Sequence, residues 1–201
     1  MRSSCYGESN DMTTSALGFQ DKDIAQGELR VSPQQTLAVG LAVTPEDVRD
    51  SQRLRYQVFA DEMGATLYTE EAGLDSDAFD PWCRHVIVRE QRTRKVVAST
   101  RVLLDAEARL AGGFYSASEF DMSGLRRRAG RLMEIGRTCV HPDYRSGGAI
   151  SLLWSGLARF IDIGQIDNSV SFSTNITVVC PYYQHKLTCT FEIQGLCFCH
   201  L

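Results

Sequence analysis

The sequence has no apolar run of the kind that enters or crosses a membrane. Its first thirty residues carry Asp, Glu, Ser and Gly throughout, without the apolar core of a signal peptide. No later stretch approaches the roughly 18 consecutive apolar residues of a membrane span. We therefore expect a cytoplasmic protein, with contact at the periphery of the inner membrane as an open alternative.

The sequence also lacks a basic excess. Lys and Arg number 21 against 25 Asp and Glu, which leaves a formal net charge of -4. Nucleic-acid-binding domains normally carry the opposite balance, because they must neutralise phosphates. Nucleic acid is therefore excluded as the main partner, and any anionic partner must meet a local patch.

Cysteine spacing gives no sign of a disulfide framework or a metal site. The seven cysteines are odd in number and include no CxxC pair, and no export signal accompanies them. Reduced structural thiols are therefore expected. The spacing of the acidic residues in 70–80 lacks the glycine and the terminal glutamate that a calcium loop has at fixed positions, so we expect no metal.

The composition is that of a globular chain with one core, since 43% of 201 residues are hydrophobic and 23% are charged. Residues 1–34 show no periodicity, which predicts a flexible leader. Residues 35–167 form the expected domain. In the tail, 168–201, only Lys186 and Glu192 are charged and four of the seven cysteines occur, as a frameshifted or alternative end would produce.

Hydrophobic periodicity predicts alternating strands and helices between these ends. Thr44 and Pro45, followed by two acids, predict a helix start, and Gly64 its end. A short polar connector at 91–95 predicts an antiparallel hairpin. The expected strands are 37–43, 85–90, 96–104, 132–140 and an alternating run from 170. The expected helices are 45–63, 105–111 and 150–161, the last ending at Gly164.

The segment after the 132–140 strand has the pattern of an anion site. A strand that runs through a glycine-bearing loop into a helix presents unpaired N–H groups where the helix dipole favours negative charge. A guanidinium beside the glycines would add a phosphate contact. A plain turn remains the alternative. The loop consists of Arg145, Ser146, Gly147, Gly148 and Ala149.

Two charged residues interrupt the apolar strand that precedes this loop. Strand alternation predicts that Glu134 shares a face with Leu132, Gly136 and Thr138, whereas Arg137 shares the other face with Met133, Ile135 and Cys139. Burying an unpaired carboxylate is costly, so Glu134 should meet either an arginine or an amine substrate. A structural Glu–Arg ion pair is the competing hypothesis.

Three further features allow two interpretations each. Asp75, Asp77 and Asp80 either hold a cationic substrate or remain solvated. The basic run Arg126–Arg128 either docks an acidic carrier protein or an anionic membrane, or is a solvated turn. Cys139 has no motif-placed histidine partner, which disfavours a nucleophilic thiol.

Five stretches carry a resemblance to a known family. They are LRYQVFADEMGA from Leu54, DSDAFDPWCRHVIV from Asp75, STRVLL from Ser99, GGFYSASEFDM from Gly112, and MEIGRTCVHPDYRSGGAISLLWSGLARF from Met133. The resemblance as a whole extends over about residues 43–167. In these stretches the chain resembles the ornithine-acyl-carrier-protein N-acyltransferases, haemolysin-like GNAT proteins that begin ornithine-lipid synthesis and are related more distantly to acyl-homoserine-lactone synthases.

The resemblance implies an α/β (α+β) fold of the GNAT type: a mixed, largely antiparallel sheet flanked by helices, splayed where a pantetheine arm enters. After residue 167 the match ends, so the usual last strands are expected to be missing. The donor would be an acyl-phosphopantetheine thioester on acyl carrier protein, with acyl-CoA as the lesser alternative and no permanently bound cofactor. The acceptor would be the α-amine of ornithine.

Matching the family's motifs residue by residue implies three groups of site residues. The catalytic group is Glu134, Arg137 and Arg101; the substrate-binding group is Arg55, Phe59, Asp77 and Asp80; the donor-binding group is Cys139, Val140, Arg145, Ser146, Gly147, Gly148 and Ala149.

The implied reaction is direct attack of a neutral amine on the thioester. Glu134 would remove the amine's proton, and backbone N–H groups near Cys139 and Val140 would stabilise the oxyanion. The alternatives are a lactone-type synthase that uses S-adenosylmethionine and a truncated relative that binds the donor without turnover.

Overall fold

The computed structural model describes residues 27–32, 35–69, 71–119, 121–122, 124, 130–146, 148–172, 188–192 and 196–200. Its strands form one sheet in the order β1-β2-β3-β4-β5-β6-β8-β7. The strands are β1 (Gly27–Ser32), β2 (Gln35–Leu41), β3 (Arg84–Glu90), β4 (Val96–Leu104), β5 (Leu132–Val140), β6 (Asn168–Phe172), β7 (Thr188–Glu192) and β8 (Leu196–His200). The helices are α1 (Pro45–Tyr56), the π-helix η2 (Gln57–Glu62), α2 (Asp105–Leu110), α4 (Gly148–Gly164) and the 3-10 turns η3 (Asp80–Trp82), η4 (Tyr115–Ser118) and η5 (Pro142–Tyr144).

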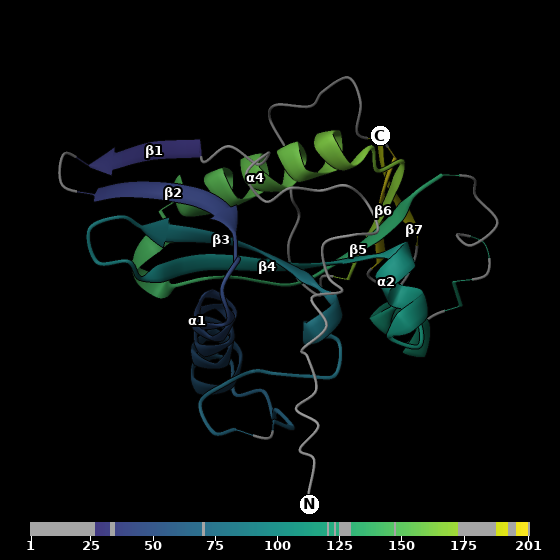
Figure 1. Ribbon diagram of the computed structural model, residues 1–201, viewed down its shortest axis with the longest axis horizontal. Helices are drawn as coiled ribbons and strands as arrows, with labels where there is room; N and C mark the ends of the chain where they lie inside the picture. Colours follow the sequence, from purple (N-terminus) through teal and green to yellow (C-terminus); the bar gives the residue numbers. More distant parts are fainter. Residues whose placement is uncertain are drawn as a thin grey trace, which may run out of the picture.

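The sheet is mixed and largely antiparallel, as expected. Only β5 and β6 pair in parallel among the described strands. Helix α4 contacts β1 to β4 on one face, while α1 contacts β3, β4 and β5 on the other (Figure 1). Helix α1 thus packs on β5, the strand that carries Glu134, Arg137, Cys139 and Val140 of the predicted site.

The first helix begins and ends where the sequence predicts. The Thr44 side chain accepts a hydrogen bond from the Asp47 N–H, and Asp47 accepts one from the Thr44 N–H, which makes a capping box. After Tyr56 the helix widens into the π-helix η2, a form that often occurs at functional sites. Gly64, with φ of 72°, then ends the helical segment.

Two boundary expectations need correction. Strand β1 lies inside the segment 1–34 that the sequence predicts to be a leader; its apolar Leu29 and Val31 alternate with polar residues, a short pattern that pairing with β2 turns into a hairpin. Residues 1–26 lie outside the described part. The expected alternating run from 170 begins within β6, which pairs with β5; β8 and β7 extend the sheet further, where the usual last strands were expected to be missing.

A bulge in β5 overturns the predicted faces of this strand. Ser99 pairs with Cys139 but Arg101 pairs with Gly136, so β5 contains one extra residue, and Arg137 has φ of 54°. One extra residue reverses the alternation beyond it. Met133 and Ile135 pack on the α4 side, whereas Cys139 packs with Leu54 on the α1 side. Arg137 therefore shares a face with Glu134, not with Met133.

Helix α4 lies close to the sheet at a glycine. Leu153, Leu157 and Phe160 are each 1% exposed in the core beneath the helix. A Cβ built on Gly156 would lie 2.4 Å from Cγ2 of Val39, a buried β-branched side chain with little rotameric freedom. The close approach of α4 to β2 therefore depends on the absence of a side chain at 156.

We predict that Gly156→Ala lowers the free energy of unfolding by about 1–3 kcal/mol, because overpacking outweighs the gain in helix propensity. Denaturant unfolding monitored by circular dichroism measures this change. In a Val39→Ala background the same substitution should cost much less, since the clashing methyl groups are gone. Ser155→Ala, at an exposed position of the same helix, is the control. Equal effects of Gly156→Ala in both backgrounds would contradict the packing argument.

Candidate active site

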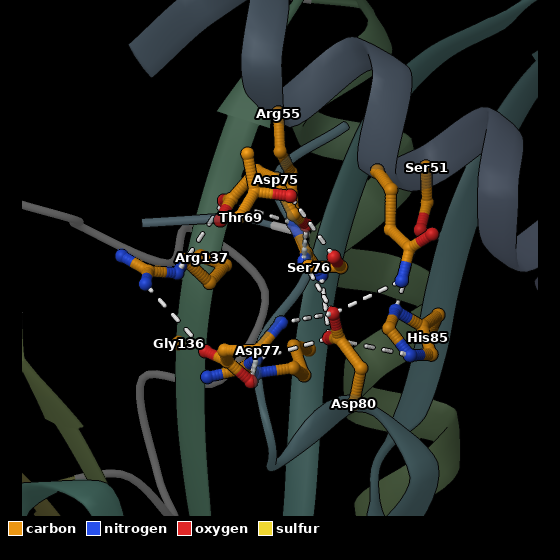
Figure 2. A network of polar contacts seen from close by, with 12 residues as sticks. Ser51, Arg55, Thr69, Asp75, Ser76, Asp77, Asp80, His85, Gly136 and Arg137 are labelled. Atoms are coloured by element: carbon orange, nitrogen blue, oxygen red, sulfur yellow. Dashed lines mark hydrogen bonds and ion pairs between the residues drawn. The ribbon is translucent and has the colours of Figure 1, made fainter. Parts of the chain in front are cut away.

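Three arginines and three aspartates form one network beneath α1. The residues are Arg55, Arg101, Arg137, Asp75, Asp77 and Asp80 (Figure 2). They come from α1, β4, β5 and the segment 75–80, so the network joins elements that are distant in sequence. The aspartates therefore do not remain solvated, which was one of the two interpretations of the acidic stretch.

Arg55 is the centre of this network. Its side chain is 0% exposed, and its Nε lies 3.2 Å from Oδ2 of Asp75. The two terminal nitrogens donate to both carboxylate oxygens of Asp80, at 3.0 and 2.8 Å, and Nη2 also donates to the Asp75 carbonyl. This bidentate geometry fits the planar fork of a guanidinium. Arg55 thus fixes the segment 75–80 against α1.

Arg101 completes the shell around Asp80. Its Nη1 lies 2.6 Å from Oδ1 of Asp77 and 3.0 Å from Oδ1 of Asp80. Burial would by itself raise the pKa of the Asp80 carboxyl, but the hydrogen bonds and charge of Arg55, with the charge of Arg101, hold that pKa well below its ordinary value. Asp80 is therefore a permanent carboxylate and a structural anchor for both arginines.

His85 lies on the other side of Asp80. Its Nδ1 is 3.3 Å from the Ser51 hydroxyl, and its Nε2 is 3.8 Å from Oδ1 of Asp80 (Figure 2). The imidazole is 2% exposed, and burial lowers its pKa to about 4 despite the nearby carboxylate. His85 is therefore neutral at physiological pH.

Within the part of the chain that the structure describes, N–H and O–H donors hold Glu134, and no arginine does. Its Oε2 accepts the Tyr115 N–H at 2.8 Å, and its Oε1 accepts the Ser116 N–H at 2.7 Å as well as the Ser116 hydroxyl. The residue is only 6% exposed. Among the described residues Glu134 forms no ion pair with an arginine, which was the competing hypothesis. The first turn of η4 instead compensates the buried charge.

Arg137 lies at the margin of the network. Its Nε is 3.5 Å from Oδ2 of Asp75 and its Nη2 is 3.6 Å from Oδ2 of Asp77, both longer than hydrogen bonds (Figure 2). Its guanidinium carbon also lies 5.9 Å from the centre of the Tyr115 ring. Tyr115 therefore contacts both Arg137 and, through its N–H, Glu134.

The predicted phosphate loop leads into α4 as expected. Ser146 is exposed, Gly148 begins the helix and Ala149 is fully buried beneath it; Gly147 lies outside the described residues. The Arg145 guanidinium forms a bidentate pair with Glu62 of η2, at 2.5 and 2.7 Å, and its Nε donates to the Val140 carbonyl. A phosphate at this place would compete with Glu62.

The second half of β5 has an open edge within the described part of the chain. Strand β6 pairs only with residues 132–135. The His141 N–H donates to Val97 of β4, so strand alternation directs the Val140 N–H to the opposite, open edge. A rise of about 3.3 Å per residue separates Val140 from Glu134 by roughly 20 Å. The Val140 N–H therefore does not lie beside the Glu134 carboxylate.

Two remaining candidates pack as apolar residues. Cys139 is 5% exposed, and burial raises the pKa of its thiol to about 12, which agrees with the prediction that it is no nucleophile. Phe59 packs against the same small cluster, with Leu54 and Val58. Both residues fill space between α1, η2 and β5. The predicted docking residues Arg126, Arg127 and Arg128 lie outside the described residues.

Sequence reasoning missed several residues of the site. Tyr115 and Ser116 hold Glu134, Glu62 holds Arg145, and His85 and Gln52 both face Asp80, to which the Gln52 amide donates at 3.0 Å. The stretch GGFYSASEFDM contains Tyr115 and Ser116, but no residue pattern indicates that their backbone N–H groups donate to Glu134. Across the described ranges, no three His, Cys, Asp or Glu side chains gather into a set able to hold a metal ion.

A family model described as an acetyltransferase (GNAT) domain matches residues 54–155, half of the chain. The chain belongs to the GNAT acetyltransferase family. The match includes the end of α1, β3, β4, β5 and the start of α4, and thus all the site residues that the sequence predicts; Ser51 and Gln52 lie just before it. Among the described residues, no helix of this GNAT chain has both the length and the apolar character to span a membrane.

Curated relatives show which acyltransferases within the GNAT family this chain resembles. An L-ornithine N(alpha)-acyltransferase of Rhodobacter capsulatus is 39% identical over 136 residues, which cover 64% of this chain and 52% of the relative. One of Brucella abortus is 39% identical over 141 residues, 66% of this chain and 50% of the relative. The similarity to this family is therefore confirmed. The chain spans about half the length of the curated relatives it matches.

Solved structures share the fold. An N-acyl amino acid synthase from uncultured soil microbes superposes with a TM-score of 0.57 at 12% identity, covering 83% of this chain and 91% of that one. A CoA-dependent acyl-homoserine lactone synthase, solved with SAM and isopentyl-CoA, gives 0.56 at 19% identity, covering 77% and 74%. The GNAT fold is therefore confirmed beyond the matched family segment.

We predict that Arg55→Met lowers the free energy of unfolding by about 3–5 kcal/mol, because Asp75 and Asp80 lose a buried partner while the side-chain volume is largely kept. Arg53→Met is the control on the same helix: Arg53 is 46% exposed, and its pairs with Glu46 and Asp50 should contribute less than about 1 kcal/mol. Equal losses in denaturant unfolding of the two variants would contradict a central role for Arg55.

His85 should make the fold sensitive to mild acid. Its pKa is about 4 in the folded protein against 6.5 in the unfolded chain, so the unfolded chain binds the proton first. The stabilisation is complete above pH 6.5 and is lost as the pH falls towards 4, on the order of 3 kcal/mol in all. We predict that His85→Gln flattens this part of the stability profile, measured by denaturant unfolding at several pH values. An unchanged slope would refute the assignment.

Proposed function

We propose that this chain is an N-acyltransferase that moves a fatty acyl group, such as a 3-hydroxyacyl group, from acyl carrier protein to the α-amine of ornithine, the first step of ornithine-lipid synthesis. One observation carries the proposal: the bulge in β5 brings Glu134 and Arg137 to one face, on the strand whose open edge leads to the N-terminus of α4. The arrangement offers an acceptor site and a donor path on one strand.

The donor occupies the open edge of β5. Its phosphate meets the first N–H groups of α4, where the helix dipole favours an anion, with the loop residues Arg145 to Ala149 around it. The pantetheine arm then runs along residues 136–140, where the Val140 N–H faces it. Because Val140 lies far from Glu134, we assign the Val140 N–H to the pantetheine arm. In this proposal the N–H groups near Cys139 and Val140 therefore do not stabilise the oxyanion.

Glu134 acts on the acceptor amine. Its two carboxylate oxygens accept the N–H groups of Tyr115 and Ser116, and these hydrogen bonds fix the orientation of the side chain that receives the proton. The neutral amine attacks the thioester carbonyl, a C–N bond forms as the C–S bond breaks, and Glu134 receives the amine's proton directly or through a water. The thiolate leaves on the pantetheine arm, so no covalent enzyme intermediate is needed.

The acidic segment suits a cationic acceptor. A cavity of about 760 Å³ lies between the start of α1 and residues 76–84, and both Asp77 and Asp80 line it. Asp80 is committed to Arg55 and Arg101, whereas Asp77 is 22% exposed. We assign Asp77 to the side-chain ammonium of ornithine and Arg55, Arg101 and Asp80 to the frame that positions it.

We place the reaction in the cytoplasm, at the periphery of the inner membrane, because the acyl product is a lipid precursor. The donor is assigned to acyl carrier protein from the family resemblance, and acyl-CoA is the competing donor. Supplying each donor in turn distinguishes them, and supplying S-adenosylmethionine in place of ornithine tests for lactone synthesis.

The test is acyl transfer by the purified 201-residue chain, followed by mass spectrometry of acyl-ornithine. We predict that Glu134→Gln lowers kcat by about 10²–10⁴, the usual contribution of a general base. Glu119→Gln, an exposed glutamate just after η4, should leave kcat unchanged. Thermal unfolding of both variants checks folding. No acyl-ornithine from either donor with the unaltered chain would refute the proposed function.

A further inference from the structure

Arg137 is the guanidinium of the network with hydrogen-bonding capacity to spare. Its buried Nε has no hydrogen-bond partner among the described residues. Its side chain is 29% exposed, against 0% for Arg55 and 7% for Arg101. The other two arginines donate directly to aspartates, at 2.6–3.2 Å. Arg137 can therefore accept a further anionic partner that the others cannot.

The two aspartates nearest to Arg137 lie closer to the other two arginines. Oδ2 of Asp75 is closer to Arg55, at 3.2 Å, than to Arg137, at 3.5 Å. Oδ1 of Asp77 binds Arg101 at 2.6 Å, which leaves Oδ2 at 3.6 Å from Arg137. These aspartates partly offset the charge of Arg137 but accept no hydrogen bond from its N–H groups. A carboxylate that approached from the exposed side would form shorter, charge-assisted hydrogen bonds.

The position of Arg137 is specified by unusual backbone geometry. With φ of 54°, Arg137 adopts the left-handed backbone conformation that residues other than glycine rarely take. Such strain clusters at ligand sites, where it aims a side chain. Here the bulge turns Arg137 to the face of Glu134, and Tyr115 contacts both residues.

We infer that Arg137 binds the α-carboxylate of the amino-acid acceptor. This inference rests on the proposed function and deepens it. In an α-amino acid the amine is attached one carbon from the carboxylate, so a carboxylate held by Arg137 places the α-amine between Arg137 and Glu134. The same contact distinguishes the α-amine of ornithine from its δ-amine and from amines without a carboxylate. Arg137 is thus a specificity-determining residue.

A set of matched acceptors tests the inference. Ornithine, ornithinamide and 1,4-diaminobutane keep the amines but differ in the carboxylate. We expect the unaltered chain to prefer ornithine to ornithinamide by about 10–100-fold in kcat/KM, as for the loss of one charge-assisted pair. Arg137→Gln should reduce this preference to about twofold or less, and Arg137→Lys should retain part of it, because lysine keeps the charge but loses the bidentate fork.

The possible outcomes separate this inference from the proposed function. If Arg137→Gln slows acylation of ornithine and ornithinamide by the same factor, Arg137 does not read the carboxylate and the inference is wrong, although the acyltransferase assignment stands. If the unaltered chain acylates none of the acceptors, calorimetric titration with ornithine and ornithinamide decides: a preference for ornithine that Arg137→Gln removes supports the inference, and equal or absent binding refutes it.

Discussion

The burial of Arg55 between Asp75 and Asp80 is the interaction on which the site depends. Taking charges out of water is costly, and only the bidentate geometry and the additional donors around Asp80 offset that cost. The network ties α1, the segment 75–80 and β4 together with hydrogen bonds and reaches β5 through the longer ion pairs of Arg137. The surrounding apolar clusters supply most of the cohesion. The permanent charge of the Asp80 carboxylate, whose pKa is held well below its ordinary value, keeps Arg55 and Arg101 in place at neutral pH.

Most of the framework was predictable because each element has a strong local signal. The Thr44 cap, the 150–161 periodicity and the 132–140 strand all appear in the structure close to their expected bounds. The membership of the charged cluster was also suggested by the family motifs. Its pairing was not, because Arg55 and Asp80 meet only through tertiary packing across 25 residues.

The faces of β5 could not be predicted from strand alternation because the strand contains a bulge. Alternation is reliable until one extra residue enters the strand, and the residue that takes the left-handed conformation is Arg137, not the adjacent Gly136 that a sequence would suggest. Likewise, nothing in a sequence indicates that backbone N–H groups of a short turn compensate the charge of Glu134. Both features lie at the site itself, where local rules are most often broken.

The bulge also determines what a length change in this strand would do. Inserting a single residue between Glu134 and Arg137 while the bulge is kept would turn the two side chains to opposite faces of the sheet. The carboxylate and the guanidinium would then be separated by the thickness of the backbone, with every charge still present. For this protein, the spacing of three along the chain is as much a part of the site as the identity of the two residues.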